Sequence, residues 1–248
     1  MQSLARDNNQ PSKGSPDDSE RTREGKRSAF SSLWRRLTGK TRPRPQRSTE
    51  PRPPAPSCDD ITESPDFIKK RQRLESLAKE FGYEPSKVTL SPRKKNFEYL
   101  GQSFTSEGEA WPDGRIDIYF DPEMSDARMG CCLAHELQHL KYFVVRKAYH
   151  AERPDGPLHQ RFAKFTSDLL AARRGVSDYS NEHWDAWKGK SPPKLFSMEL
   201  EEGQSEPINE TIAEVAKAQY NWGPDVWIDP IWKELQKAVN EEYEKRRT

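Results

Sequence analysis

The chain of 248 residues is poor in apolar side chains, with 32% hydrophobic residues and a mean hydropathy of −1.08. No apolar run approaches the length of about 18 residues that a membrane-spanning helix needs, so a transmembrane segment is not expected. The net charge of +1 hides an uneven distribution, because residues 1–57 carry 13 Lys and Arg against 6 Asp and Glu, a net of +7. The remaining residues are therefore mildly acidic.

Residues 1–57 also hold 8 of the 20 prolines, together with many serines. A segment of this composition cannot bury enough apolar surface to offset the entropy of its chain. We therefore predict a disordered basic tail rich in Pro, Ser and Arg over residues 1–60. The same reasoning predicts one folded domain over 61–248, which is long enough to bury a single core.

One part of the tail has a pattern of its own. Phe30, Leu33, Trp34 and Leu37 recur at helical spacing beside basic residues. Residues 28–40 therefore suit a short amphipathic segment that contacts an anionic membrane surface or a partner, although a nuclear import patch or a solvated tail fits as well. The tail has few aromatic residues among its charges, so no specific nucleic acid is expected as a partner, only salt-sensitive attraction.

The start of the chain lacks the apolar core of a signal peptide. We therefore expect a cytoplasmic protein, or one delivered by a non-classical route such as a bacterial injection apparatus, and we expect a monomer.

The folded part shows helical and alternating apolar patterns in a clear order. The predicted elements are a helix over 66–81, strands over 87–90, 97–105 and 114–121, and helices over 126–149, 157–174, 207–220 and 229–247. Residues 176–204 are polar and rich in turns, and they could line or cover a cleft. This order predicts an α+β fold with a small mixed sheet.

The helix predicted over 126–149 contains His135-Glu136-Leu137-Gln138-His139, the pattern HExxH. Two histidines four residues apart project from one face of a helix, so both rings can bind one metal ion. The intervening Glu136 then lies beside the metal, where it can take a proton from a metal-bound water. Chance, or a pair of histidines that merely pack, would give the same letters. The apolar stripe of Leu133, Leu137 and Leu140 on the same helix favours the metal site.

A third metal ligand must come from elsewhere in the chain. One common arrangement places a glycine three residues and a histidine six residues after the second histidine, but here these positions are Tyr142 and Val145. Glu210 on the helix over 207–220 is the favoured ligand, and Glu214, one turn later, could accept the other N–H of a ligand histidine. Other candidates for the third ligand stay open, namely Glu214 itself, His150, His159, His183 or another acid.

At these residues the chain resembles the gluzincin-type zinc metallopeptidases. The string Asn209-Glu210-x-x-Ala213-Glu214 is similar to the corresponding helix in the anthrax lethal factor family of toxin proteases. The resemblance covers roughly residues 85–222, rests on about a dozen positions in two helices, and departs from the families at Cys132. It implies a zincin-like fold that hydrolyses protein or peptide substrates with a Zn²⁺ ion held by His135, His139 and Glu210. It also implies that the last strand of the sheet is an edge strand near the cleft, which can pair with an extended peptide.

In the implied mechanism Glu136 takes a proton from the zinc-bound water and passes it to the leaving amine. A further donor normally stabilises the oxyanion, and the candidates are Tyr220, Tyr179 and His183. Two alternatives remain: a catalytically inert zincin-like scaffold that acts through its basic N-terminal tail, and a protease that the tail recruits to nucleic acid.

Overall fold

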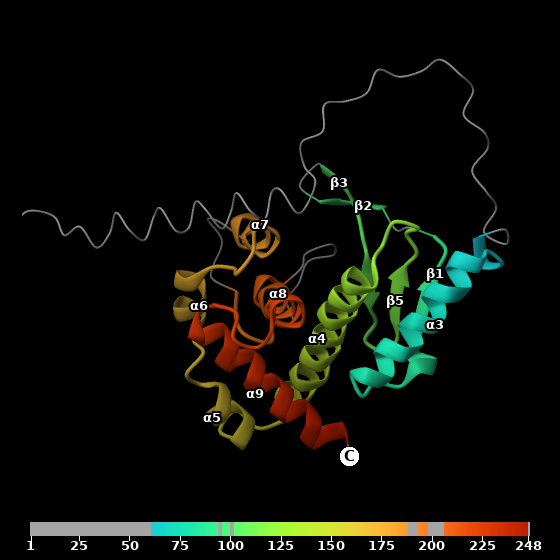
Figure 1. The fold of residues 1–248 in the computed structure, drawn as a ribbon. Coiled ribbons are helices and arrows are strands. Elements are labelled where there is room, and N and C mark those ends of the chain that lie inside the picture. Colours follow the sequence, from blue (N-terminus) through green and yellow to red (C-terminus); the bar gives the residue numbers. More distant parts are fainter. Residues whose placement is uncertain (1–60, 94–95, 100–101, 188–192, 198–205, 248) are drawn as a thin grey trace, which may run out of the picture. The chain divides into compact units, whose positions relative to one another are not determined.

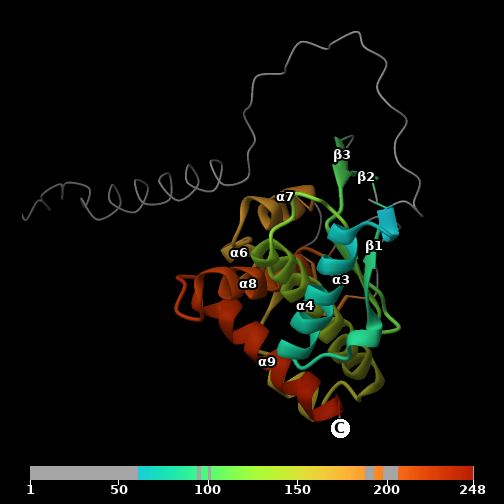
Figure 2. The same cartoon turned by 45° about the vertical axis from the view of Figure 1, so that its right-hand side comes forward.

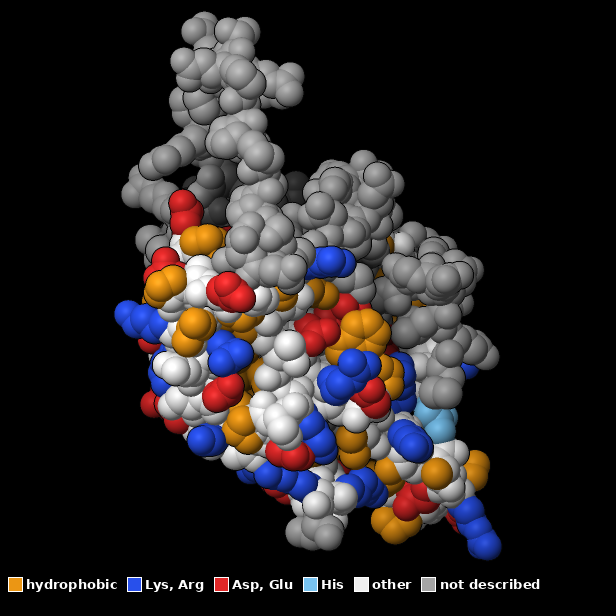
Figure 3. Space-filling model, turned by 90° about the vertical axis from the view of Figure 1, so that its right-hand side faces the viewer, with side chains coloured by type: hydrophobic (Ala, Val, Ile, Leu, Met, Phe, Trp, Pro, Cys, Tyr) orange, Lys and Arg blue, Asp and Glu red, His pale blue; other side chains and the backbone are white. Residues whose placement is uncertain are grey.

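A computed structural model describes residues 61–93, 96–99, 102–187, 193–197 and 206–247 of the chain. The predictions on the basic tail, including the amphipathic segment 28–40, concern residues outside these ranges. Within them, no helix is both long enough and apolar enough to cross a bilayer. On the molecular face drawn in Figure 3, the coloured side chains of both charge signs are interspersed, so this face presents no uniformly basic patch.

The described residues form an α+β structure that is mostly helical and contains a small three-stranded sheet (Figure 1). The predicted helices over 66–81, 126–149, 207–220 and 229–247 and the strands over 87–90 and 114–121 are confirmed to within a few residues. The elements are, in chain order, α3 (Pro65–Glu80), η1 (Pro85–Lys87), β1 (Val88–Ser91), β2 (Asn96–Tyr99), β3 (Gln102–Thr105), β4 (Gly108–Ala110), β5 (Ile116–Tyr119), α4 (Asp126–Ala151), α5 (Pro157–Phe162), α6 (Ser167–Arg173), α7 (Asp178–Ala186), α8 (Pro207–Trp222) and α9 (Pro230–Arg247).

The three-stranded sheet has the order β1-β5-β4, with β1 parallel and β4 antiparallel to β5. Leu90 pairs with Ile118, and Ile118 pairs in turn with Gly108, so these three residues share one face of the sheet. That face packs against α3 and α4, which lie side by side, and together they enclose the first of two hydrophobic cores (Figure 1).

Two predictions about the strands are wrong. Residues 97–105 do not form one strand, because the chain reverses between Tyr99 and Gln102 and the two halves pair as a separate antiparallel sheet. The sequence places Gly101, a residue common in turns, at this reversal, and the prediction of a single strand passed over that signal. The last strand of the sheet, β5, was also expected to be the edge strand near the cleft, but it is central. The edge strand that contacts α4 is β4, which lies in a segment predicted to be a connection between strands.

Two of the later helices also differ from the prediction. Both begin at polar capping residues, which a pattern of apolar residues does not reveal. The single helix predicted over 157–174 is interrupted between α5 and α6, because Thr166 caps a new helix by accepting a hydrogen bond from the backbone of Leu169. Residues 176–204 contain α7, which Ser177 and Ser180 begin through a reciprocal capping box. Figure 2 shows α7 and α8 near α4, on the side away from β1.

Helix α4 connects the two halves of the domain. Ser125 caps it, accepting from the backbone of Arg128, and its 26 residues span about 39 Å. The predicted stripe of Leu133, Leu137 and Leu140 lies in the core with the sheet, as expected. Later in the helix, Tyr142 and Val145 are fully buried in a second core with α8 and α9.

Candidate metal centre

The structure brings together the two histidines of α4 and a carboxylate from the first turn of α8. The Nε2 atoms of His135 and His139 lie 3.0 Å apart, and Oε2 of Glu210 lies 3.6 Å from the former and 3.7 Å from the latter. A tetrahedral ion with bonds of about 2.0–2.2 Å holds its ligand atoms about 3.4 Å apart. The three donor atoms therefore form a triangle of the size that such an ion requires.

Glu210 points at the histidines because of the apolar pattern of α8. Pro207 occupies the first turn, and Ile208, Ile212 and Val215 are fully buried in the second core. Packing of these residues leaves Glu210 to face α4, which runs along α8 (Figures 1 and 2). The first turn of a helix also carries positive partial charge, which favours a carboxylate there.

The electrostatics of Glu210 suit a metal ligand. Burial alone would raise the pKa of this carboxyl group, but His139, His135 and His183 together hold it well below its usual range. Among the described residues its buried Oε2 atom has no hydrogen-bond partner. A buried, ionised oxygen without a partner beside two ring nitrogens is a fitting donor set for a cation.

Glu214 lies one turn beyond Glu210 and on the other side of the His135 ring. Its Oε1 atom is 3.2 Å from Nδ1 of His135 and 3.0 Å from Nζ of Lys217. Burial would raise the pKa of Glu214, yet the contacts with His135 and Lys217 lower it to about 2. The ionised carboxylate therefore attracts the Nδ1 side of the ring and leaves Nε2 toward the other two ligand atoms, the orientation common in metal-bound histidines.

Glu136 lies beside the cluster and is only 7% exposed. Burial raises the pKa of its carboxyl group, although His135 and His139 act in the opposite direction. Across from it on β4 is Gly108, where a Cβ atom would lie 2.9 Å from Cγ and 3.0 Å from Oε1 of Glu136. Only glycine fits there without moving Glu136, so β4 helps to fix this carboxylate. The sequence pattern missed Gly108, whose only signal was a glycine in a presumed connection.

Of the three candidate oxyanion donors, two lie at the cluster, both on α7. Tyr179 lies close enough to Glu210 for the two groups to interact electrostatically, and its ring centre is 6.2 Å from that of His135 and 4.7 Å from that of His183. Burial raises the pKa of Tyr179 well above its usual value and lowers that of His183. The helix covering the cluster thus lies within the segment 176–204 that was predicted to line or cover a cleft.

The third candidate donor is placed elsewhere. Tyr220 follows Glu214 by six residues, about 240° around the helix, and its ring packs on Phe81 with a centroid separation of 5.3 Å. Its hydroxyl lies against Gly130, near the start of α4.

The remaining histidines considered as third ligands are also not brought to the cluster. His150 contacts the carbonyl of Phe196, and Nε2 of His159 lies 3.0 Å from the carbonyl of Tyr149. Both contacts are made near the C-terminal end of α4, more than two helical turns after His139.

Comparison of the chain with protein-family models, with curated proteins and with solved structures gives no match. The inference of function therefore rests on the side chains that the fold places around His135, His139 and Glu210.

Proposed function

We propose that the protein is a zinc-dependent endopeptidase with a zincin-like fold of the gluzincin type. The observation that carries this proposal is the triangle of His135 Nε2, His139 Nε2 and Glu210 Oε2, with the carboxylate of Glu136 buried beside it. Two imidazoles and one carboxylate are a typical ligand set of catalytic zinc sites, in which the fourth position stays open for water or substrate. Bound zinc would lower the pKa of that water and polarise the scissile carbonyl.

Glu136 supplies the proton transfer in this proposal. Its pKa is raised by burial, which brings the carboxyl group closer to the range in which it can both accept and release a proton near neutral pH. Glu136 takes the proton of the attacking water and delivers it to the leaving amine. Gly108 supports this step because it leaves room for the carboxylate while the strand behind limits its movement.

Strand β4 offers a place for an extended protein or peptide substrate. It is the edge of the three-stranded sheet, and no described strand pairs with its outer side. Because Gly108 touches Glu136, a peptide added along this edge would run past the proposed general base. Tyr179, whose ring lies beside His135 and His183, is the residue best placed to donate a hydrogen bond to the developing oxyanion.

Metal analysis and a cleavage assay on the full chain test the proposal. We expect zinc in the wild type and in Glu136→Gln, and loss of zinc in His135→Ala and Glu210→Ala. On an unbiased peptide library, Glu136→Gln should cleave at least about 10²-fold more slowly than the wild type. Glu123→Gln, the same change at an exposed residue, is the matched control and should behave as the wild type.

Each part of the proposal has its own contradicting result. A wild-type chain that binds no zinc would remove the metal site. Cleavage by Glu136→Gln at the wild-type rate would remove the general base. Loss of zinc in His135→Ala but not in Glu210→Ala would assign the third ligand to another residue, with Glu214 the first to examine.

A further inference from the structure

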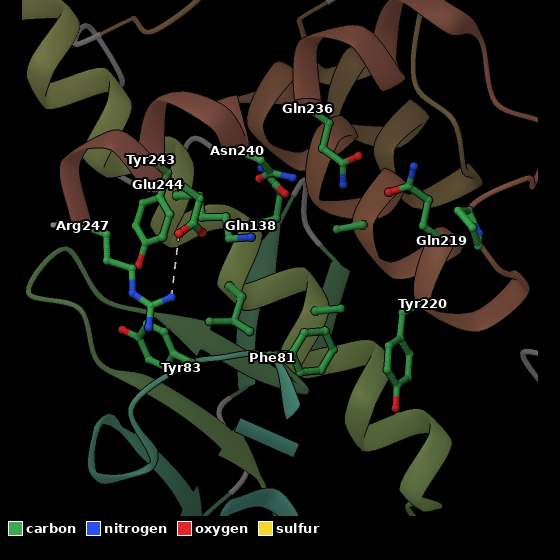
Figure 4. A pocket seen from close by; sticks show the side chains of 15 residues that line it. Phe81, Tyr83, Gln138, Gln219, Tyr220, Gln236, Asn240, Tyr243, Glu244 and Arg247 are labelled. Carbon is green, nitrogen blue, oxygen red and sulfur yellow. Dashed lines mark ion pairs between the residues drawn. The ribbon is translucent and has the colours of Figure 1, made fainter. Parts of the chain in front are cut away.

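A second pocket lies against a different face of α4. It has a volume of about 280 Å³ and is enclosed by the chain after α3 and by faces of α4, α8 and α9 (Figure 4). From α4 it takes Ala134, Leu137, Gln138 and Lys141, none of which is a residue of the metal centre. The pocket and the metal centre are thus separate sites on the same two helices, α4 and α8.

Four carboxamide side chains line this pocket, namely Gln138, Gln219, Gln236 and Asn240. Gln138 is 2% exposed and Gln236 is 5% exposed. Within the described part of the chain, Nε2 of Gln138 and Oδ1 of Asn240 are buried without a hydrogen-bond partner. Leaving such atoms unpaired costs stability, so the fold leaves hydrogen-bonding capacity unused among the side chains that line the pocket.

The rest of the lining limits what a ligand of this pocket can be. The rings of Phe81 and Tyr220 lie 5.3 Å apart at 34° and give one side of the pocket flat aromatic surfaces. The charged groups offset one another in part, since Glu244 and Arg247 form an ion pair at 4.0 Å (Figure 4) and Lys141 lies over the ring of Tyr243. The pocket therefore suits a ligand that is close to neutral.

We propose that this pocket binds a small, neutral ring compound with an amide edge, the class that includes nucleobases and nicotinamide. A carboxamide side chain presents one acceptor and two donor hydrogens, and a half-turn of its last torsion exchanges them, so it matches the mixed edge of such a ring. The aromatic side chains can stack on the face of the ring. The volume of about 280 Å³ has room for a single ring system.

Thermal unfolding of the full chain with uracil or nicotinamide tests this inference, because a ligand that binds only the folded state raises the melting temperature. We expect at least one of the two probes to raise the melting temperature of the wild type. Gln236→Leu should bind that probe at least about tenfold more weakly. Gln72→Leu, the same change at an exposed residue of α3, should bind it as the wild type does.

Without a probe, Gln236→Leu should unfold at the same temperature as the wild type or higher, because leucine removes a buried amide and keeps its approximate size. This readout distinguishes a lost ligand contact from a damaged fold, and Asn240→Leu provides a second variant of the same design. Uridine 5′-monophosphate in a parallel titration distinguishes a free ring from the base of a nucleotide.

Three results would overturn the inference. The first is a wild-type chain that neither probe stabilises. The second is equal stabilisation of wild type, Gln236→Leu and Asn240→Leu. The third is equal stabilisation by glucose, which would assign the pocket to polyols. None of these measurements depends on zinc or on peptide cleavage, so the outcome is independent of the proposed function.

Discussion

Glu214 lies 3.2 Å from Nδ1 of His135 through the same oxygen that Lys217 contacts at 3.0 Å. Lys217 is partly exposed, whereas Glu214 is almost fully buried. The contacts from Lys217 to Glu214 and from Glu214 to His135 therefore connect the surface with a proposed metal ligand. The carboxylate fixes the direction of the imidazole before any metal arrives. Metal affinity should therefore depend on a residue that does not touch the metal.

The first prediction concerns Glu214→Ala. Removing the carboxylate frees the His135 ring, so we expect zinc affinity to fall by about 10–100-fold, measured by competition with a chromogenic chelator. Glu214→Gln keeps an acceptor oxygen and should lose less, and Lys217→Met should have the smallest effect. Unchanged affinity in Glu214→Ala would mean that this contact does not orient the ligand.

The second prediction concerns Gly108→Ala. The added methyl group would lie 2.9 Å from Cγ of Glu136, so the carboxylate must shift away from its present position. We expect zinc content to stay at the wild-type level and turnover to fall by about 10²-fold. Ala110→Gly, two residues along the same strand, is the control for strand stability and should retain activity. Full activity in Gly108→Ala would show that Glu136 tolerates the shift.

The third prediction compares two tyrosines. Tyr179→Phe removes the hydroxyl proposed to donate to the oxyanion, and we expect kcat to fall by about 10²–10³-fold with a smaller change in KM. Tyr220→Phe is a matched control, since its hydroxyl lies against Gly130 instead. The reverse order of effects would remove Tyr179 as the oxyanion donor.

The fourth prediction concerns Glu206, which is 2% exposed at the start of α8 and accepts a hydrogen bond from Tyr142. Burial raises its pKa from 4.5 to about 8, so the folded protein keeps a proton that the unfolded chain releases. The stability contributed by this proton is complete below about pH 4.5 and is lost as the pH rises through about 8.

Glu206→Gln should lack this dependence, because the amide cannot ionise. Subtracting the free energy of unfolding of the variant from that of the wild type, at a series of pH values, isolates the effect of Glu206. A difference that stays constant between pH 5 and 8, the range bounded by the two pKa values, would contradict the assignment.

The features that could be predicted from the sequence are those that depend on residues close together in the chain. The spacing of His135 and His139 is a local property of one helix, and the leucine stripe fixes which side of that helix faces the sheet. Both were confirmed because neither needs distant contacts. Strand β4 and the approach of Gly108 to Glu136 arise only when the sheet packs on α4, so no local pattern could predict them.

Helix α8 contains one residue whose position was predicted correctly, Glu210, and one whose position was not, Tyr220. Its approximate bounds were predicted from the sequence, and Glu210 lies beside His135 and His139, as the choice of third ligand expected. Tyr220 is on the same helix and was a reasonable candidate by proximity along the chain. Its rotation about the helix axis directs it to Phe81 and the second pocket, which depends on how α3 and α9 pack.

The position of α4 in both cores has a consequence for how the domain unfolds. Leu133 and Leu140 belong to the core with the sheet, whereas Tyr142 and Val145 belong to the core with the C-terminal helices. If the elements packed on one side of α4 unfold, apolar residues of α4 become exposed to water. This would destabilise α4, on which the other core also depends. Unfolding monitored by tryptophan fluorescence, to which the buried Trp184 and Trp232 of the helical core contribute, should therefore coincide with unfolding monitored by circular dichroism. Zinc release should follow that same transition, since the ligands would separate only when the two cores do.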